Sequence, residues 1–219
     1  CRSTCPSGMG TVRLAAFGDL HLGRRKAPGV AWAREALADA TRNGADAIVF
    51  TGDLLDKKKA TGKDLDDAVD LFRMVTHELE RPLVHVWGNH DVGSGMIPLF
   101  PEIRGVHRPT DDAVAEIRVP DLPLVFHAVN VTQDPDPRDV VKHLPRAEEP
   151  GHIGVLHSEV EGRYTKNPCL PTTTEHLLSL GYGACLMGHV HSPVVLHEEP
   201  WIGWIGMGQM LEIEVAALP

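Results

Sequence analysis

The sequence predicts a layered α/β fold in which most strands run parallel. Over roughly the first 90 residues, short apolar runs of strand length alternate with segments whose apolar residues recur every three or four positions. This βαβαβ order implies right-handed crossovers and parallel neighbouring strands. In addition, a polar block containing Asp, Asn or His directly follows each of five predicted strands. Such blocks are typical of the sheet edge where the carboxyl ends of parallel strands form a binding site.

The first half of the chain is expected to hold three buried strands and two helices. Residues 12–17, 47–51 and 82–87 are short apolar runs, which is typical of strands buried on both faces. Between them, apolar residues at helical spacing predict amphipathic helices over 30–40 and 65–79. Each helix would connect two neighbouring parallel strands.

The second half is expected to be richer in strands. In chain order, they are predicted over residues 114–119, 122–129, 153–156, 184–187, 194–196, 201–205 and 211–215. The first two would form a hairpin, and the last three a closing meander. A short helix would begin at a capping box of Thr172 and Glu175 and end at Gly181. The Pro- and Asp-rich stretch 134–139 is expected to be a loop.

Length and composition favour one domain. A chain of 219 residues, 42% of them hydrophobic, can bury a substantial core, and we expect residues 9–219 to form a single domain. Residues 1–8 are expected to be a leader outside the fold, either an appended remnant or a disordered segment, with lipidation of Cys1 as an alternative. No apolar run approaches the roughly 20 residues that span a bilayer, so no membrane contact is expected. The four cysteines match neither a disulfide framework nor a zinc ribbon, which favours reduced thiols and a cytoplasmic location.

The charge balance restricts the class of partner. With 21 Lys and Arg against 30 Asp and Glu, the formal net charge is −9, which argues against a passive nucleic-acid binder. A phosphate-rich substrate would need local cations or metal. Arg24, Arg25, Lys57 and Lys58, within the runs 24–26 and 57–59, are our candidate substrate-binding residues. The alternative is that these runs, together with Lys63, are solvated loop charges.

The polar blocks after the strands have the composition of a metal site. They contribute Asp19, His21, Asp53, Asn89, His90, Asp91, His157, His189 and His191. A carboxylate that bridges two divalent ions holds them about 3.5–4 Å apart, and neutral imidazoles complete the coordination without excess negative charge. This mixed nitrogen and oxygen set without thiolate argues against structural zinc. It favours Mn²⁺, with Fe or catalytic Zn²⁺ as alternatives.

The blocks also resemble a known family. D-x-H at Asp19, G-D-x-x-D at Gly52, G-N-H-D at Gly88, the single His157 and G-H-x-H at Gly188 are similar to the signature of calcineurin-like metallophosphoesterases. Within that superfamily, 19–23, 154–163 and 188–202 resemble the SbcD-type DNA-repair exonucleases. The resemblance implies a four-layer αββα sandwich with two mixed β-sheets.

The resemblance further implies a role for each residue of the blocks. One divalent ion would be held by Asp19, His21 and His191, and a second by Asn89, His157 and His189, with Asp53 bridging them. His90 would be the catalytic histidine that protonates the leaving oxygen or stabilises the transition state, and Asp91 would orient it.

The expected activity is hydrolysis of phosphodiester bonds by a metal-bound hydroxide that attacks phosphorus in line, with DNA or another nucleic acid as substrate. A phosphatase or a small cyclic-nucleotide phosphodiesterase is the alternative enzyme, and a non-catalytic interaction scaffold is the alternative class. The intact ligand set with His90 argues against the scaffold. An SbcC-type ATPase partner is a further expectation from the resemblance, and the oligomeric state is left open.

Two departures from the family pattern affect these expectations. Ile205-Gly206-Met207-Gly208 stands where the family commonly has a Pro-Gly-Ser or Pro-Gly-Asn turn. The given sequence also holds no downstream capping domain or ATPase-binding segment, so we expect single-stranded or frayed DNA to be preferred over blunt duplex. The metal chemistry is expected to survive both departures.

A few conspicuous residues are assigned to the structure rather than to the site. His85, His127 and Trp87 are expected in the core, and Asp56 either supports a ligand or closes a turn. The remaining histidines are expected at the surface, namely His77, His107, His143, His152, His176 and His197.

Overall fold

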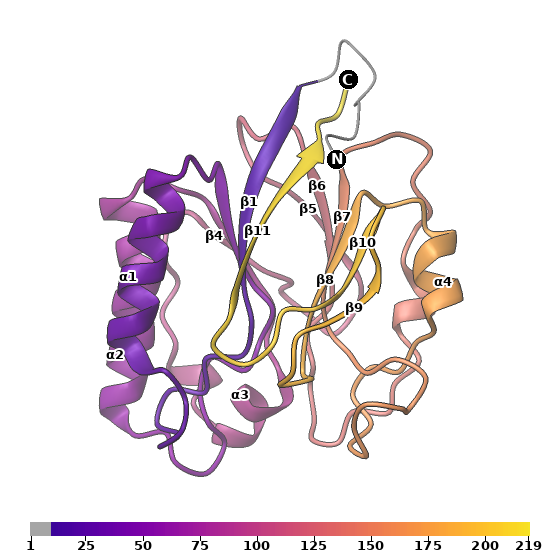
Figure 1. The fold of residues 1–219 in the computed structure, drawn as a ribbon. Helices are drawn as coiled ribbons and strands as arrows, with labels where there is room; N and C mark the ends of the chain where they lie inside the picture. The colour runs from indigo at the N-terminus through magenta and orange to yellow at the C-terminus, as the bar shows by residue number, and fades with distance from the viewer. Residues whose placement is uncertain (1–9) are drawn as a thin grey trace.

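Two β-sheets face each other in the computed structural model, which describes residues 10–219 (Figure 1). The expected leader, residues 1–8, lies outside the described residues. The first sheet has the order β11-β1-β2-β3-β4 and the second the order β5-β6-β7-β8-β10-β9. Strand bounds are β1 Thr11–Phe17, β2 Ala47–Phe50, β3 Leu83–His85, β4 Val106–His107, β5 Ala115–Arg118, β6 Val125–Ala128, β7 His152–His157, β8 Ala184–Gly188, β9 Val194–His197, β10 Trp201–Trp204 and β11 Met210–Ala216.

Both sheets are mixed. β1 to β4 pair in parallel, and β11 adds an antiparallel edge at β1. In the second sheet, β6, β7, β8 and β10 pair in parallel, and β5 and β9 form antiparallel edges. The parallel strands of each sheet therefore present their carboxyl ends at one edge, where loops from both sheets meet.

Helices cover the outer faces of the sheets. α1 (Gly29–Arg42) and α2 (Gly62–Arg73) lie on the first sheet, and α4 (Thr174–Ser179) lies on the second (Figure 1). Separate hydrophobic clusters fill the space between α1–α2 and the first sheet, between the two sheets, and between the second sheet and α4 with its adjoining loops. Three cores between four layers confirm the predicted αββα sandwich with two mixed sheets.

The first-half elements form largely where the sequence places them. α1 buries Ala33, Leu37 and Ala40, the predicted apolar face. α2 starts at a capping box of Thr61 and Asp64 and runs on into a π-helical turn, η1 (Met74–Glu78). The second helix is therefore confirmed over its predicted length, but its last turn is wound more widely than the 3.6-residue spacing implies.

Two second-half predictions are corrected. The last strand does not close a meander, because β11 leaves the second sheet and pairs with β1 in the first. The cap of α4 is Thr173, whose hydroxyl accepts from His176 N, while Thr172 forms an isolated bridge with Val160. The helix does end before Gly181, which has a positive φ of 73°.

Short elements without periodicity were not predicted. They are α3 (Asn89–Ser94), β4 and the 3₁₀ turns η2 (Ile97–Leu99) and η3 (Val141–His143). α3 contains only six residues and begins directly after the loop that follows β3. It matters for the site because it carries three of the predicted site residues, Asn89, His90 and Asp91.

The residues assigned to the core are buried. Trp87 packs against Phe100 and against His85, which is fully buried. Neither ring nitrogen of His85 has a hydrogen-bond partner within the described part of the chain. His127 is buried and bonds His152, which is half-buried rather than exposed. Cys169 and Cys185 are buried free thiols. None of the helices formed within residues 10–219 combines the length and the apolar character needed to cross a membrane.

Candidate metal centre

The loops after β1 and β2 are joined by backbone hydrogen bonds before any side chain is considered. His21 N donates to Asp53 O at 2.9 Å, and Leu22 N donates to Leu54 O at 2.9 Å. The turn after β10 fixes the same region, since Gly208 N donates to Asp19 O and Met207 N to His191 O, both at 2.9 Å. The Gly206-Met207-Gly208 departure thus lies in a turn that holds two of the predicted ligand loops.

The first predicted ligand group converges. One ligand atom from each of Asp19, His21 and His191 lies within 4.8 Å of the others. His21 Nε2 and His191 Nε2 face each other at 3.0 Å. Burial lowers the pKa of His21 to about 3 and also lowers that of His191. Without a metal ion, the two neutral rings can place at most one proton between these nitrogens. A metal cation at the same position would accept a lone pair from each nitrogen.

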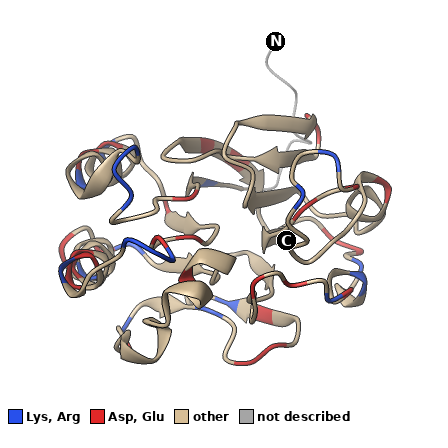
Figure 2. Cartoon of the chain, turned by 90° about the horizontal axis from the view of Figure 1, so that it is seen from below, with Lys and Arg blue, Asp and Glu red and all other residues tan. Residues whose placement is uncertain are grey.

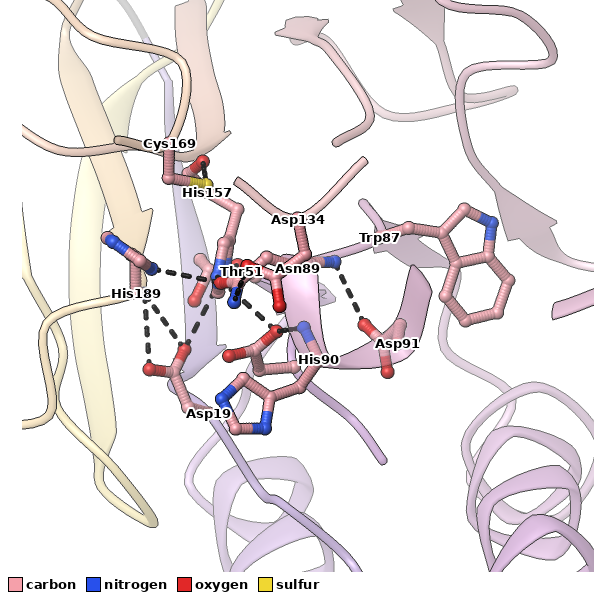
Figure 3. Close-up of polar contacts among 12 residues, drawn as sticks. Asp19, Thr51, Trp87, Asn89, His90, Asp91, Asp134, His157, Cys169 and His189 are labelled. Atoms are coloured by element: carbon pink, nitrogen blue, oxygen red, sulfur yellow. Dashed lines mark hydrogen bonds and ion pairs between the residues drawn. The ribbon is translucent and has the colours of Figure 1, made fainter. Parts of the chain in front are cut away.

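The second predicted group converges on one oxygen. Asn89 Oδ1 lies 3.1 Å from His157 Nε2 and 3.0 Å from His189 Nδ1 (Figure 3). His157 Nδ1 lies 2.9 Å from Thr51 O and donates its proton there, so Nε2 is the ring nitrogen left for the site. His189 and Asp19 connect the two groups, because His189 N donates to both carboxylate oxygens of Asp19 at 3.1 Å.

Asp53 lies between the two groups. Its Oδ2 is 3.6 Å from His21 Nε2 in the first group, and its Oδ1 is 3.4 Å from His157 Nε2 in the second. Oδ1 also accepts a hydrogen bond of 2.8 Å from His90 N. One carboxylate thus presents an oxygen to each group, which is the arrangement that a bridging ligand requires.

Three of these residues have a left-handed backbone conformation, which residues other than glycine rarely adopt. The φ angle is 45° at His21, 51° at Asp53 and 95° at His189. Each such conformation costs on the order of 1–3 kcal/mol and persists only where the surroundings enforce it. The strain falls on predicted ligands from both sheets, which indicates that the backbone is held to aim their side chains.

Glycines allow the layers to approach at this point. A Cβ at Gly88 would lie 2.2 Å from Asp53 Oδ1, and one at Gly188 would lie 2.6 Å from Asp19 Oδ1 and 2.3 Å from Thr51 O. Neither glycine has room for a side chain. The glycines of the G-N-H-D and G-H-x-H blocks are therefore required by close packing around the two carboxylates.

The electrostatics of the centre fit a bound cation. Burial acts to lower the pKa of His157, but the negative charges of Asp53 and Asp19 outweigh it and raise that pKa to about 9. Burial raises the pKa of Asp19 to about 7. The proton on His157 thus compensates the charge of buried carboxylates. A divalent cation between the same groups would supply that positive charge and release the proton, as metal binding by histidine requires.

His90 lies beside the centre and is held by a different carboxylate from the one expected. Its Nδ1 is 3.6 Å from Asp56 Oδ2 and 3.4 Å from Lys57 N. Asp91 instead accepts from Leu55 N at 2.8 Å and from Gly88 N at 2.9 Å, and the second bond caps the first turn of α3. The predicted orientation of His90 by Asp91 is therefore corrected, since Asp91 positions the loop and Asp56 faces the imidazole.

Asp56 closes a turn, which is one of the two roles that the sequence left open. Its Oδ1 accepts from Lys58 N at 3.0 Å and from Lys59 N at 3.1 Å, which closes a turn. Its Oδ2 faces His90 and lies 4.0 Å from Arg24 Nε. The turn thus fixes the carboxylate that contacts the predicted catalytic histidine.

Asp134 is a site residue that the sequence analysis missed. Its Oδ1 accepts from Asn89 Nδ2 at 3.2 Å and from Asn167 Nδ2 at 3.0 Å, and its Oδ2 pairs with Lys57 Nζ at 2.6 Å. Because the amide nitrogen of Asn89 is engaged here, its oxygen turns toward His157 and His189. The only sequence signal for this role was an acidic residue in a loop, and that signal is too common to be informative.

Cys169 also lies close to the second group, but as a neutral thiol. Its Sγ is within 4.8 Å of ligand atoms of His157 and His189, and it donates to His157 O at 3.2 Å. Burial, reinforced by nearby carboxylates, raises the pKa of the Cys169 thiol well above its ordinary value. The thiol is therefore protonated, and His157 O accepts its hydrogen bond.

Two cavities open at the centre. One of about 340 Å³ is lined by candidate ligands and by the loop that carries Tyr164, Thr165 and Asn167. The other, of about 620 Å³, is lined by the cationic runs 24–26 and 57–59. All four predicted substrate-binding residues therefore lie around one cavity, although Lys57 is paired with Asp134.

Residues 12–193 match the model of a family described as calcineurin-like phosphoesterase. A dimetal phosphatase from Danio rerio has a similar structure, with a TM-score of 0.57, 12% identity, and coverage of 94% of this chain and 96% of that chain. The protein TT1561 of Thermus thermophilus gives a TM-score of 0.50 at 16% identity, covering 90% of each chain. The search of curated proteins gave no significant match.

Proposed function

Because the chain belongs to the calcineurin-like phosphoesterase family and is thus a metal-dependent phosphoesterase, we propose that it hydrolyses phosphodiester bonds in nucleic acid. The observation that carries the proposal is the meeting of the two ligand groups at Asp53 with His90 and a cationic cavity beside them. Two divalent cations, when bound, would polarise the phosphoryl group, activate water and neutralise the charge that develops during displacement.

The residues of the chain then have separable tasks. Asp19, His21 and His191 would hold one cation and Asn89, His157 and His189 the other, with Asp53 shared. His90 is not one of the predicted ligands, although it lies close to His21 and Asp56. It lines the 340 Å³ cavity, where it could give a proton to the leaving oxygen. Asp56 would keep its imidazole turned toward that cavity.

We propose Mn²⁺ as the metal, since the donors are imidazole, carboxylate and amide without thiolate. Fe and Zn²⁺ are the alternatives to be compared in the same experiment.

The choice of a diester over a monoester is supported by the cationic runs. A small phosphomonoester would fill the metal-site cavity and leave the second cavity unused. A chain of phosphates would extend beyond the metals toward Arg24, Arg25 and Lys58. Such a cluster of positive charge stands out in a chain with a net charge of −9. The alternative activity is that of a phosphatase, which is the description of the Danio rerio protein with the similar fold.

The test is direct. Protein stripped with a chelator and reloaded with Mn²⁺, Fe²⁺ or Zn²⁺ is assayed on bis-p-nitrophenyl phosphate, p-nitrophenyl phosphate and a single-stranded oligonucleotide. We expect the diester and the oligonucleotide to be cleaved with higher kcat/KM than the monoester. Higher activity on the monoester would establish the phosphatase alternative, and no activity with any metal would overturn the proposed function.

A further inference from the structure

The 620 Å³ cavity concentrates positive charge at one place on a negative molecule. Its wall is formed by two loops, and Figure 2 shows blue stretches on neighbouring loops where Lys and Arg gather. The lining residues with positive charge are Arg24, Arg25, Lys26, Lys57, Lys58 and Lys59. Among the described residues, the only acidic one in the lining is Asp56.

Most of this charge is not neutralised within the part of the chain that the structure describes. Lys57 pairs with Asp134 at 2.6 Å, and Arg24 lies 4.0 Å from Asp56. No ion pair of residues 10–219 involves Arg25 or the other lysines of the cavity. In addition, Arg24 Nη1 is buried and has no hydrogen-bond partner among residues 10–219. A buried donor of this kind destabilises the fold unless a ligand satisfies it.

The cavity is coupled to the metal centre by one side chain. His90 lines both this cavity and the 340 Å³ cavity of the candidate ligands, and no other described residue is common to the two linings. In the proposed function His90 gives a proton to the leaving oxygen. The group attached to that oxygen is therefore directed past His90 toward the cationic cavity.

We infer that the cavity formed by residues 23–26 and 56–59 binds a second phosphate group, carried by the leaving part of the substrate. This inference rests on the proposed function and narrows its substrate class. The preferred substrate is then a phosphodiester whose leaving group bears a further phosphate, as every internal linkage of a nucleic acid does. An isolated diester with an uncharged leaving group would be a poorer substrate.

The reaction itself is ordinary hydrolysis and needs no further reactant. An oxygen of water forms a bond to phosphorus, and the bond between phosphorus and the leaving oxygen breaks. The leaving oxygen takes up a proton and becomes a hydroxyl group. The second phosphate remains on that hydroxyl-bearing product and undergoes no change.

Three small substrates test the inference with the full chain loaded with metal. They are thymidine–phosphate–thymidine and the same compound with one additional phosphate on its free 5′ or its free 3′ hydroxyl. Product analysis shows which nucleoside leaves with the hydroxyl group. We expect kcat/KM to rise on the order of tenfold when the extra phosphate is on that nucleoside, and to change little when it is on the other.

Matched charge variants locate the effect. Arg25→Gln/Lys58→Gln should reduce the advantage of the extra phosphate to about twofold or less. Arg42→Gln/Lys142→Gln removes the same charge from exposed residues outside the cavity lining and should keep the full advantage. The readout is the ratio of kcat/KM with the extra phosphate to kcat/KM without it, so a general loss of activity does not affect it.

The outcomes separate this inference from the proposed function. If the parent dinucleotide and bis-p-nitrophenyl phosphate are cleaved but the extra phosphate gives no advantage, the inference is overturned and the phosphodiesterase remains. The inference is also overturned if the extra phosphate helps only on the opposite nucleoside. The same holds if its advantage falls equally in both double variants. Failure to cleave any diester would instead contradict the proposed function.

Discussion

At the scale of single residues, Asp53 has the most consequential position because it contacts both ligand groups. Replacing its carboxylate with an amide removes the negative charge that both groups share. We expect Asp53→Asn to weaken both metal sites together, whereas His191→Ala should mainly weaken the site it shares with Asp19. Metal titration by calorimetry, with metal content measured at saturation, checks this.

Wild-type protein should bind close to two ions per chain in that experiment. Lys142→Gln is a suitable control, since its side chain is exposed and pairs only with Asp139 among the described residues. One tightly bound ion that is indifferent to Asp53→Asn would contradict the bridged arrangement.

Asp134 provides a test of how the amide ligand is oriented. It holds Asn89 Nδ2 and Lys57 Nζ at once. We expect Asp134→Ala to lower metal affinity about 10- to 100-fold, the usual range for a partner that orients a ligand. The loss should be confined to the site of Asn89, because His21 and His191 have no contact with Asp134 among the hydrogen bonds of residues 10–219. Equal weakening of both sites would indicate a general loosening of the loop.

His90 is expected to matter most when the leaving group is poor. A sugar alkoxide needs a proton, whereas a nitrophenolate leaves readily without one. His90→Ala should therefore reduce kcat on an oligonucleotide about 10²- to 10⁴-fold, and clearly less on bis-p-nitrophenyl phosphate, with metal content unchanged. Equal losses on both substrates, or loss of an ion, would show that His90 is not the proton donor.

For single residues, the sequence predicted the types and the order of the candidate ligands but not the partners that hold them. The five blocks could be recognised because each ligand lies at a fixed spacing from a strand end. The role of Asp91 was assigned wrongly because its carboxylate turns back to the loop amides of Leu55 and Gly88 rather than to its neighbour in sequence, His90. Asp134 and Cys169 are brought to the site by loops of the second sheet, and only the tertiary structure shows that.

At the scale of elements, hydrophobic periodicity predicted the longer helices and strands and failed where other forces decide. α3 has six residues and is set by the Asp91 cap rather than by an apolar face. β4 has two residues, too few for any pattern. The pairing of β11 with β1 could not be predicted either, because alternation along a strand specifies its faces but not its neighbour.

The contact between β6 and β7 gives the protein a measurable response to acid. Burial, reinforced by the nearby charge of His152, lowers the pKa of His127 to about 4. Its Nε2 lies 2.7 Å from His152 Nδ1 and its ring stacks on Tyr182, while Glu116 and Arg118 of β5 act on it with opposite signs. His127 is therefore neutral in the folded protein at pH values where an unfolded histidine is charged.

The direction of the effect follows from linkage. With a folded pKa of about 4 against 6.5 in the unfolded chain, the unfolded state binds more protons between these values. Stability from His127 is thus complete above about pH 6.5 and is lost as the pH falls toward 4, by up to about 3 kcal/mol. We expect His127→Phe to lose less stability than wild type between pH 7 and pH 5 in urea unfolding. An identical loss in both proteins would contradict the assignment.

At the scale of the whole molecule, the site exists because two sheets present their carboxyl edges to each other. Sheet one supplies Asp19, His21, Asp53 and Asn89, and sheet two supplies His157, His189 and His191. The alternation of strands and helices indicated layers and a common edge. That there are two sheets came from the family resemblance, since no periodicity distinguishes one large sheet from two.

β11 helps to hold the two sheets together. It pairs with β1 along seven residues, and its inward side chains Leu211, Ile213 and Val215 join the core between the sheets. We expect Val215→Ala to lower the free energy of unfolding by about 1–3 kcal/mol. Glu214→Ala, on the exposed face of the same strand, should change it by less than about 1 kcal/mol. Comparable effects of the two substitutions in urea unfolding would contradict this role.

The pairing of the first strand with the last also governs what happens during synthesis. Residues 11–17 are made before their partner, residues 210–216, which follows almost 200 residues later. At the common translation rates of about 5–20 residues per second, one edge of β1 waits roughly ten seconds or more without its partner. An unpaired apolar edge is a template for aggregation, so the nascent chain has reason to engage a chaperone until β11 arrives.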